Sequence, residues 1–145
     1  MRAAAAALTG FLLSAAPAIA ADPVEGEWLS EGGRARIRLA PCPAAADRLC
    51  GTILSLKDPN DPATGRPRLD IHNPDAKLRA RPVVGLPFLR DFKRADPGRW
   101  TGGKIYDPES GKTYDSKLRL NPDRTLKLEG CVLMICRAQT WRRAG

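Results

Sequence analysis

The stretch from Gly102 to Tyr114 is predicted to form two β-strands joined by a tight turn, and it constrains the fold more than any other segment. The turn is Asp107-Pro108-Glu109-Ser110-Gly111. Its aspartate can hydrogen-bond the backbone, its proline presets φ, and its glycine tolerates a left-handed conformation. Tyr106 and Tyr114 flank the turn and are expected to face each other, or to lie diagonally, on the sheet.

Alternation of apolar and polar side chains continues on both sides of this hairpin. In segment 34–39, arginines alternate with Ala35, Ile37 and Leu39. Segments 112–120 and 125–129 follow the same rule. Strict period-two alternation is typical of strands that bury one face. The resulting prediction is eight strands, at residues 26–29, 34–39, 49–57, 88–94, 99–106, 112–120, 125–129 and 137–143.

The apolar faces of these strands must be buried, which favours an all-β fold closed into an antiparallel up-and-down barrel. A sandwich is the alternative. Segment 40–47 is expected to be a loop, and one short helix is expected between the third and fourth strands. Asn73 would cap this helix and Pro74 would occupy its first position. The helix would run for about two turns and end near Arg81, because Pro82 follows.

Residues 1–20 have the features of a secretory signal peptide. Arg2 precedes an apolar run of small residues, and Ala18-Ile19-Ala20 matches the small-x-small cleavage rule. A membrane anchor is the alternative, but the run is short for a bilayer and ends at Pro17. We therefore expect a periplasmic or secreted product, residues 21–145, that forms a single β-barrel domain without a transmembrane segment.

The four cysteines lie after the predicted cleavage site, at Cys42, Cys50, Cys131 and Cys136. An even number of cysteines in an oxidising compartment indicates two disulfides, for which three connectivities are possible. The favoured pairing is Cys42 with Cys50 and Cys131 with Cys136, because each pair brackets a short loop. The spacings differ from the C-x-x-C pattern of zinc sites, so no metal and no cofactor are expected.

Gly26-Glu27-Trp28 resembles the Gly-x-Trp motif of the lipocalins. In that family the tryptophan of the first strand closes the barrel floor, and an arginine near the last strand stacks on it. Arg137, Arg142 and Arg143 are the candidates here, and Arg137 is the residue that we assign to the barrel floor beside Trp28.

Further motifs are distributed along the chain after the predicted signal peptide. They are Leu49-Cys50-Gly51, Leu56-Lys57-Asp58-Pro59, Asn73-Pro74-Asp75, Gly85-Leu86-Pro87, Gly102 to Pro108, Gly111 to Tyr114, Gly130-Cys131 and Cys136-Arg137. With the Gly-x-Trp motif, they resemble the small exported bacterial proteins grouped as domain of unknown function 2147. The resemblance implies a lipocalin-like barrel in the periplasm and implies no particular activity.

A set of aromatic and cationic residues is the candidate ligand site. In alternating strands Lys104 and Tyr106 share a face, and Trp100 has the same parity as Lys104. If this face lines the barrel, it would suit an anionic or carboxylate-bearing ligand. The alternative places the tyrosines in the core and the lysines at the barrel mouth. The candidate ligand-binding residues are Trp28, Trp100, Lys104, Tyr106, Lys112 and Tyr114.

The function expected from these features is binding of a small apolar or amphipathic ligand in the barrel. The formal net charge of +8, or +7 without Arg2, supports an alternative in which a basic surface binds anionic envelope components. The basic residues are scattered along the chain, which favours a simply solvated surface over such binding, and nucleic acid is not an expected partner. An enzyme centred on His72, the single histidine, is the least favoured possibility.

Overall fold

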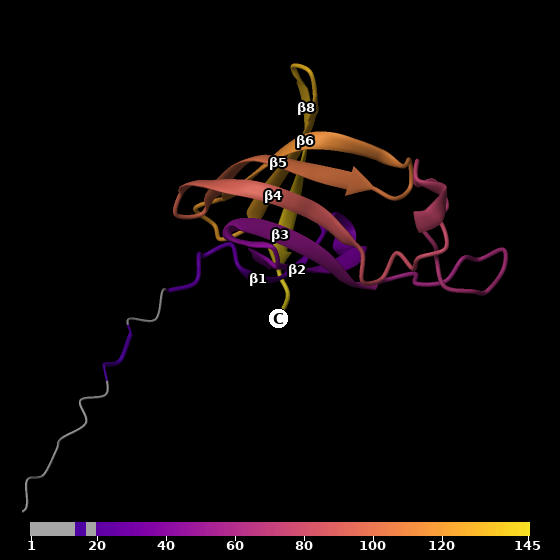
Figure 1. The fold of residues 1–145 in the computed structure, drawn as a ribbon, viewed down its shortest axis with the longest axis horizontal. Coiled ribbons are helices and arrows are strands. Elements are labelled where there is room, and N and C mark those ends of the chain that lie inside the picture. Colours follow the sequence, from indigo (N-terminus) through magenta and orange to yellow (C-terminus); the bar gives the residue numbers. More distant parts are fainter. Residues whose placement is uncertain (1–13, 17–19) are drawn as a thin grey trace, which may run out of the picture.

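The computed structural model describes residues 14–16 and 20–145, and these form a closed barrel of eight antiparallel strands (Figure 1). Neighbours in sequence are neighbours in the barrel, and β1 closes on β8. The predicted up-and-down barrel is therefore confirmed. The strands are β1 (Gly26–Leu29), β2 (Ala35–Cys42), β3 (Ala45–Leu56), β4 (Pro87–Asp96), β5 (Arg99–Asp107), β6 (Lys112–Leu120), β7 (Leu126–Val132) and β8 (Ile135–Arg143).

The predicted signal peptide and its cleavage site fall largely outside the described residues. In residues 14–16 and 20–145, no helix has the length and the apolar content that crossing a membrane requires.

Both predicted disulfides are present. Cys42 and Cys50 join β2 to β3 with a Cα–Cα distance of 4.9 Å, and Cys131 and Cys136 join β7 to β8 with one of 4.0 Å. The prediction of a loop at 40–47 is wrong, because β2 extends to Cys42 and pairs there with Ala45. Likewise β8 begins at Ile135, because Cys131 and Cys136 are direct partners in the antiparallel ladder. Each disulfide thus lies within a hairpin.

The predicted two-turn helix is reduced to a single 3-10 turn, η2 (Ala76–Leu78). The side chain of Asn73 accepts a hydrogen bond from the backbone N–H of Asp75 at 2.8 Å, which folds the chain into a local turn. Asp75 is the residue that caps η2, through the backbone N–H of Lys77 at 3.0 Å. A second 3-10 turn, η1 (Glu31–Gly33), connects β1 to β2.

The interior of the barrel is filled by one cluster of buried apolar side chains. Trp28, Leu89, Phe92 and Leu126 are each fully buried. Phe88 and Trp141 stack with their ring centroids 6.3 Å apart. Burial of this apolar surface is the main driving force that holds the strands together.

Trp28 closes the floor of the barrel, as the Gly-x-Trp motif implied. Its indole N–H donates to the carbonyl oxygen of Val24 at 2.8 Å, and the guanidinium of Arg143 lies 4.0 Å from the ring centroid. Arg143 also donates to the carbonyl oxygen of Glu25 at 2.7 Å. Gly26 has a φ of 115°, and a Cβ there would lie 2.8 Å from the Arg143 guanidinium. The spacing of glycine and tryptophan thus makes room for the arginine that covers the indole.

The assignment of Arg137 to this floor is wrong. Arg137 is exposed and pairs with Gly130 near the opposite end of β8, whereas Arg143 is the register partner of Trp28. The physical reason is the antiparallel β1–β8 pairing, which brings the last residue of β8 to the floor.

A bulge in β5 changes the face on which later residues lie. Trp100 pairs with Leu118 and Gly103 with Ser116, so β5 has one more residue here than β6. Gly102 has a φ of 65°, which a glycine adopts without strain. After the bulge Gly103 lies inward, and a Cβ there would be 2.4 Å from the ring of Phe92.

We expect Gly103→Ala to lower the free energy of unfolding by about 1–3 kcal/mol, because the added methyl group overpacks the Phe92 ring. The matched control is Gly130→Ala, where the added Cβ would lie at an ordinary 3.5 Å from Ile105. This control should change the stability by less than about 1 kcal/mol. Urea denaturation followed by tryptophan fluorescence measures both, and equal effects would contradict the assigned packing.

Candidate functional site

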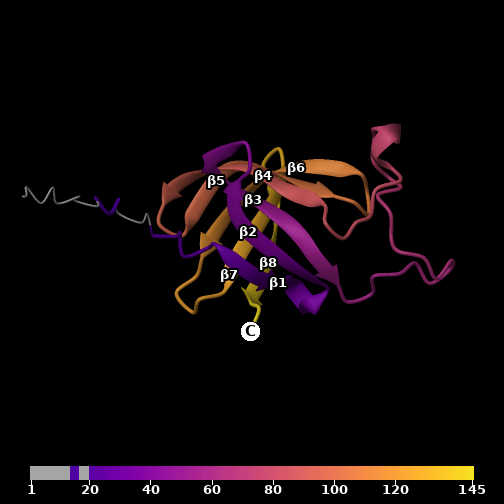
Figure 2. The same ribbon diagram turned by 60° about the horizontal axis from the view of Figure 1, so that its bottom comes forward.

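The connection between β3 and β4, residues 57–86, is the longest in the chain and extends from one end of the barrel (Figure 2). Two isolated antiparallel bridges, Asn60 with Pro67 and Leu69 with Pro82, organise it. Its return to β4 is fixed by backbone hydrogen bonds between Ile53 and residues Gly85 and Leu86, at 2.7 and 3.1 Å. We refer to residues 57–86 as the long loop.

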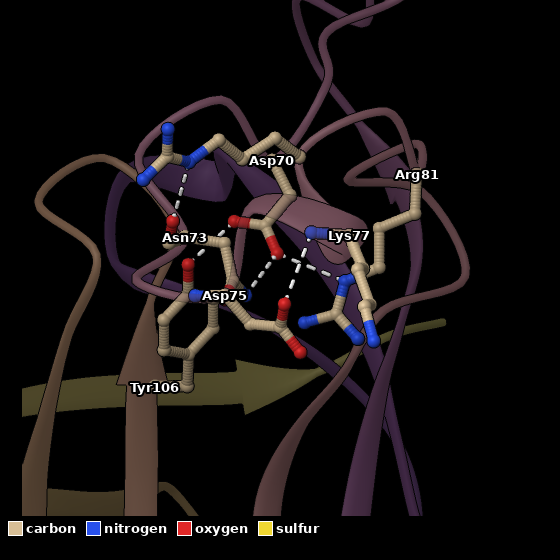
Figure 3. Close-up of polar contacts among 7 residues, drawn as sticks. Asp70, Asn73, Asp75, Lys77, Arg81 and Tyr106 are labelled. Carbon is tan, nitrogen blue, oxygen red and sulfur yellow. Dashed lines mark hydrogen bonds and ion pairs between the residues drawn. The ribbon is translucent and has the colours of Figure 1, made fainter.

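The long loop is held to the barrel through the carboxylate of Asp70, which is fully buried. The Tyr106 hydroxyl at the end of β5 donates to Asp70 Oδ1 at 2.5 Å (Figure 3). Asn73 Nδ2 and Arg81 Nε both donate to Asp70 Oδ2 at 2.8 Å. The carboxylate thus accepts one hydrogen bond from the barrel and two from the loop.

These contacts oppose each other in setting the pKa of Asp70. Burial raises it, but the hydrogen bonds from Tyr106, Asn73 and Arg81 outweigh burial and hold the pKa below its ordinary value. Burial, together with the hydrogen bond to Asp70, raises the pKa of Tyr106 to about 12. Across the neutral range the pair is therefore a carboxylate that accepts and a phenol that donates, so the anchor is structural at physiological pH.

The turn between β5 and β6 provides a second contact with the long loop. Gly111 has a φ of 70°, and a Cβ at this position would lie 1.9 Å from the carbonyl oxygen of His72. The turn and the loop are therefore packed backbone to backbone, which requires glycine here. The predicted turn at 107–111 is present, and Asp107 accepts hydrogen bonds from the backbone of Glu109 and the hydroxyl of Ser110.

An open groove of about 720 Å³ lies between the long loop and the adjoining end of β3. Its apolar lining comes from both sides, with Ile53 and Leu56 on β3 and Leu69, Ile71 and Val83 on the loop. Its polar and charged lining is mixed in sign, and the acids offset the arginines. These polar residues are Arg34, Asp58, Asp61, Thr64, Arg66, Arg68, His72 and Glu109.

His72, the residue considered for an enzymatic role, is exposed and lines this groove. The nearby Asp70 does not line the groove. Its carboxylate accepts hydrogen bonds from Asn73, Arg81 and Tyr106 instead. Within residues 14–16 and 20–145, no three histidine, cysteine, aspartate or glutamate side chains are grouped as a metal site would require. An enzymatic role of His72 therefore stays the least favoured possibility.

The six residues expected to form the ligand site are not gathered in one place. Trp28 and Trp100 are buried near the floor, and Tyr106 is buried under the long loop. Lys104 is exposed and forms an ion pair with Asp115, because the β5 bulge breaks its shared parity with Trp100. Lys112 is exposed, and Tyr114 is half-buried opposite Ile105. In the described part of the chain, none of the six lines the groove.

Trp100 contacts a residue that the sequence reasoning missed. Its indole N–H donates to the buried carboxylate of Asp22 at 3.1 Å, and Arg94 donates to the same carboxylate at 3.0 Å. The backbone N–H of Gly98 also points at it, at 3.3 Å. Asp22 lies two residues after the predicted cleavage site, and nothing local in the sequence marks it as a residue of the barrel floor.

Replacement of Tyr106 by Phe should lower the free energy of unfolding by about 1–3 kcal/mol, because it leaves one oxygen of a buried carboxylate without its donor. Tyr114→Phe is the matched control, a half-buried tyrosine on the neighbouring strand, and should cost less than about 0.5 kcal/mol. Chemical denaturation of both variants tests this, and a Tyr106→Phe variant as stable as the wild type would show that the contact is not a stabilising anchor.

Comparison with known proteins agrees with this architecture. A family model described as "Uncharacterized protein conserved in bacteria (DUF2147)" matches residues 26–143. Among solved structures, the chain is similar to "Protein HP1028 from the human pathogen Helicobacter pylori belongs to the lipocalin family", at 21% identity and a TM-score of 0.71, with 84% of this chain and 83% of that chain covered. This likeness shows a shared lipocalin-like fold. No match was found among curated protein sequences. Because the family model spans the barrel from β1 to β8, the chain belongs to the DUF2147 family.

Proposed function

We propose that this protein is an exported carrier that binds a small amphipathic ligand in the groove beneath the long loop. The observation that supports this most directly is the lining of the groove, which has an apolar wall on each side and charged groups around it. Sites for small molecules typically combine a mostly apolar concave surface with a few polar groups that orient the ligand. The lipocalin-like barrel is a fold well suited to such a site.

The groove, rather than the barrel interior, is the proposed place of binding. Large side chains fill the interior from the floor at Trp28 to the stacked pair of Phe88 and Trp141. The groove has a volume of about 720 Å³, within the range of small-molecule sites. Ile53 and Val83 belong both to the core and to the groove, so the apolar floor of the site is continuous with the barrel core.

The proposed export is supported by two observations. Each of the four cysteines is engaged in a disulfide, as expected in an oxidising compartment. The N-terminal sequence also has the organisation of a signal peptide.

Titration with anilinonaphthalene sulfonate, a dye that fluoresces in apolar sites, tests the groove. Ile71 and Val84 are both exposed apolar residues of the long loop, but only Ile71 lines the groove. We expect Ile71→Asp to weaken dye binding by about tenfold, because a charge replaces apolar contact area. Val84→Asp should leave the affinity within about a factor of two. Equal losses in the two variants, or no dye binding by the wild type, would contradict the proposal.

A second candidate function, binding of anionic envelope polymers, is favoured by one specific feature of the surface. Arg99, Arg119 and Lys127 are consecutive cross-strand partners on β5, β6 and β7. Like charges placed opposite each other repel across a sheet. Arg99 pairs with Asp96 and Lys127 with Glu129, so Arg119 at the centre of the row is the cation that has no ion pair within the described residues. The three residues line a hollow of about 420 Å³ together with Lys117 and Glu129.

Retention on immobilised heparin, a soluble model polyanion, tests this second function. We expect Arg119→Gln to elute at lower salt than the wild type, because the central charge of the row is lost. Arg90→Gln, which removes an exposed charge from β4, is the control and should elute closer to the wild type. Retention that is independent of salt, or equally reduced in both variants, would count against a specific role of the row.

A further inference from the structure

The tip of the β7–β8 hairpin exposes four consecutive large apolar side chains. The exposed fractions are 55% for Val132, 95% for Leu133, 97% for Met134 and 76% for Ile135. Single exposed apolar residues are common on protein surfaces, but a continuous run at a projecting point is not. We refer to residues 132–135 as the apolar tip. These four residues line neither the groove nor the hollow beside Arg99, Arg119 and Lys127.

The shape of the apolar tip limits what it can bind. The hairpin stands clear of the rest of the barrel (Figure 1), so the four side chains form a convex point. A convex apolar point of this size can enter the interfacial region of a lipid bilayer, where amphipathic segments bury about 5–10 Å. The Cys131–Cys136 disulfide lies directly below the tip and fixes the hairpin before binding. Such preorganisation lowers the conformational cost of association.

The charges near the apolar tip favour an anionic membrane surface. Arg137 is exposed two residues after Ile135, and it forms no ion pair within the described part of the chain. The nearest acids on β6 and β7 are already paired. Lys104 pairs with Asp115, and Glu129 accepts from Lys117 at 3.2 Å and Lys127 at 2.9 Å. The acids of β6 and β7 that lie nearest the tip, Asp115 and Glu129, are therefore compensated and do not oppose its approach to acidic head groups.

We propose that the apolar tip inserts into the interface of a membrane that carries anionic lipids, with Arg137 at the level of the head groups. This binding is independent of the ligand groove. It would attach the barrel to a membrane surface by side chains alone.

Flotation with vesicles of phosphatidylethanolamine and phosphatidylglycerol tests the proposal. We expect the double variant Leu133→Ser/Met134→Ser to lose at least about tenfold in partitioning, because two large apolar side chains no longer leave water. Leu78→Ser/Val84→Ser is the matched control, since it removes two exposed apolar side chains of the long loop that lie outside the groove. It should partition like the wild type. Arg137→Gln should weaken binding to these vesicles and reduce its dependence on salt.

Tryptophan fluorescence gives the position of the tip directly. The three native tryptophans are buried, so a blue shift on addition of vesicles reports an added indole. We expect the shift for Leu133→Trp and none for Val84→Trp.

Three results would overturn the proposal. The first is equal partitioning of the wild type and the tip double variant, and the second is equal binding to vesicles of phosphatidylcholine alone. The third is self-association that the tip double variant abolishes while the wild type does not bind vesicles, which would assign the tip to a second copy of the chain.

Discussion

The position of the long loop on the barrel depends on the hydrogen bonds to the buried carboxylate of Asp70. Removing a charge from water is costly, and here three donors offset that cost, one from the barrel and two from the loop. Loss of any donor leaves part of a buried charge unsatisfied, so the arrangement favours full assembly over partial assembly. The long loop contributes few residues to the core, chiefly Val83 and Leu86, and therefore relies on this polar anchor for its position.

The two ends of the barrel are closed by the same kind of interaction. At the floor, Asp22 is buried and accepts from the indole of Trp100 near the start of β5. At the other end, Asp70 is buried and accepts from the phenol of Tyr106 near the end of β5. In both cases an aromatic donor on one strand binds a carboxylate from outside the sheet, and an arginine completes the contact. β5 therefore fixes both the N-terminal segment and the long loop.

The sequence predicted those features that local patterns determine. Period-two alternation gave the eight strands, and the short spacing of the cysteines gave both disulfide pairs. The Gly-x-Trp motif placed Trp28 at the floor. These predictions succeeded because neighbouring strands in an up-and-down barrel are neighbours in sequence, so the decisive contacts are short in range.

The features that sequence reasoning missed depend on distant contacts. Asp22 and Trp100 are separated by 78 residues, and Asp70 and Tyr106 by 36, so no local motif marks either pair. The β5 bulge moved Lys104 away from the face of Trp100 by inserting one residue, which alternation alone does not reveal. Arg143 could not be separated from Arg137 without the register of β1 and β8. The groove was missed because it exists only where the folded loop meets β3.

Amide hydrogen exchange of an Asp70→Asn variant tests most directly whether this carboxylate positions the loop. The matched control is Asp75→Asn, which alters the exposed cap of η2 in the same loop. We expect Asp70→Asn to accelerate exchange throughout residues 57–82 while the amides of the β-ladder stay protected, and we expect no such acceleration in the control. Unchanged exchange in the loop of the Asp70→Asn variant would contradict this expectation.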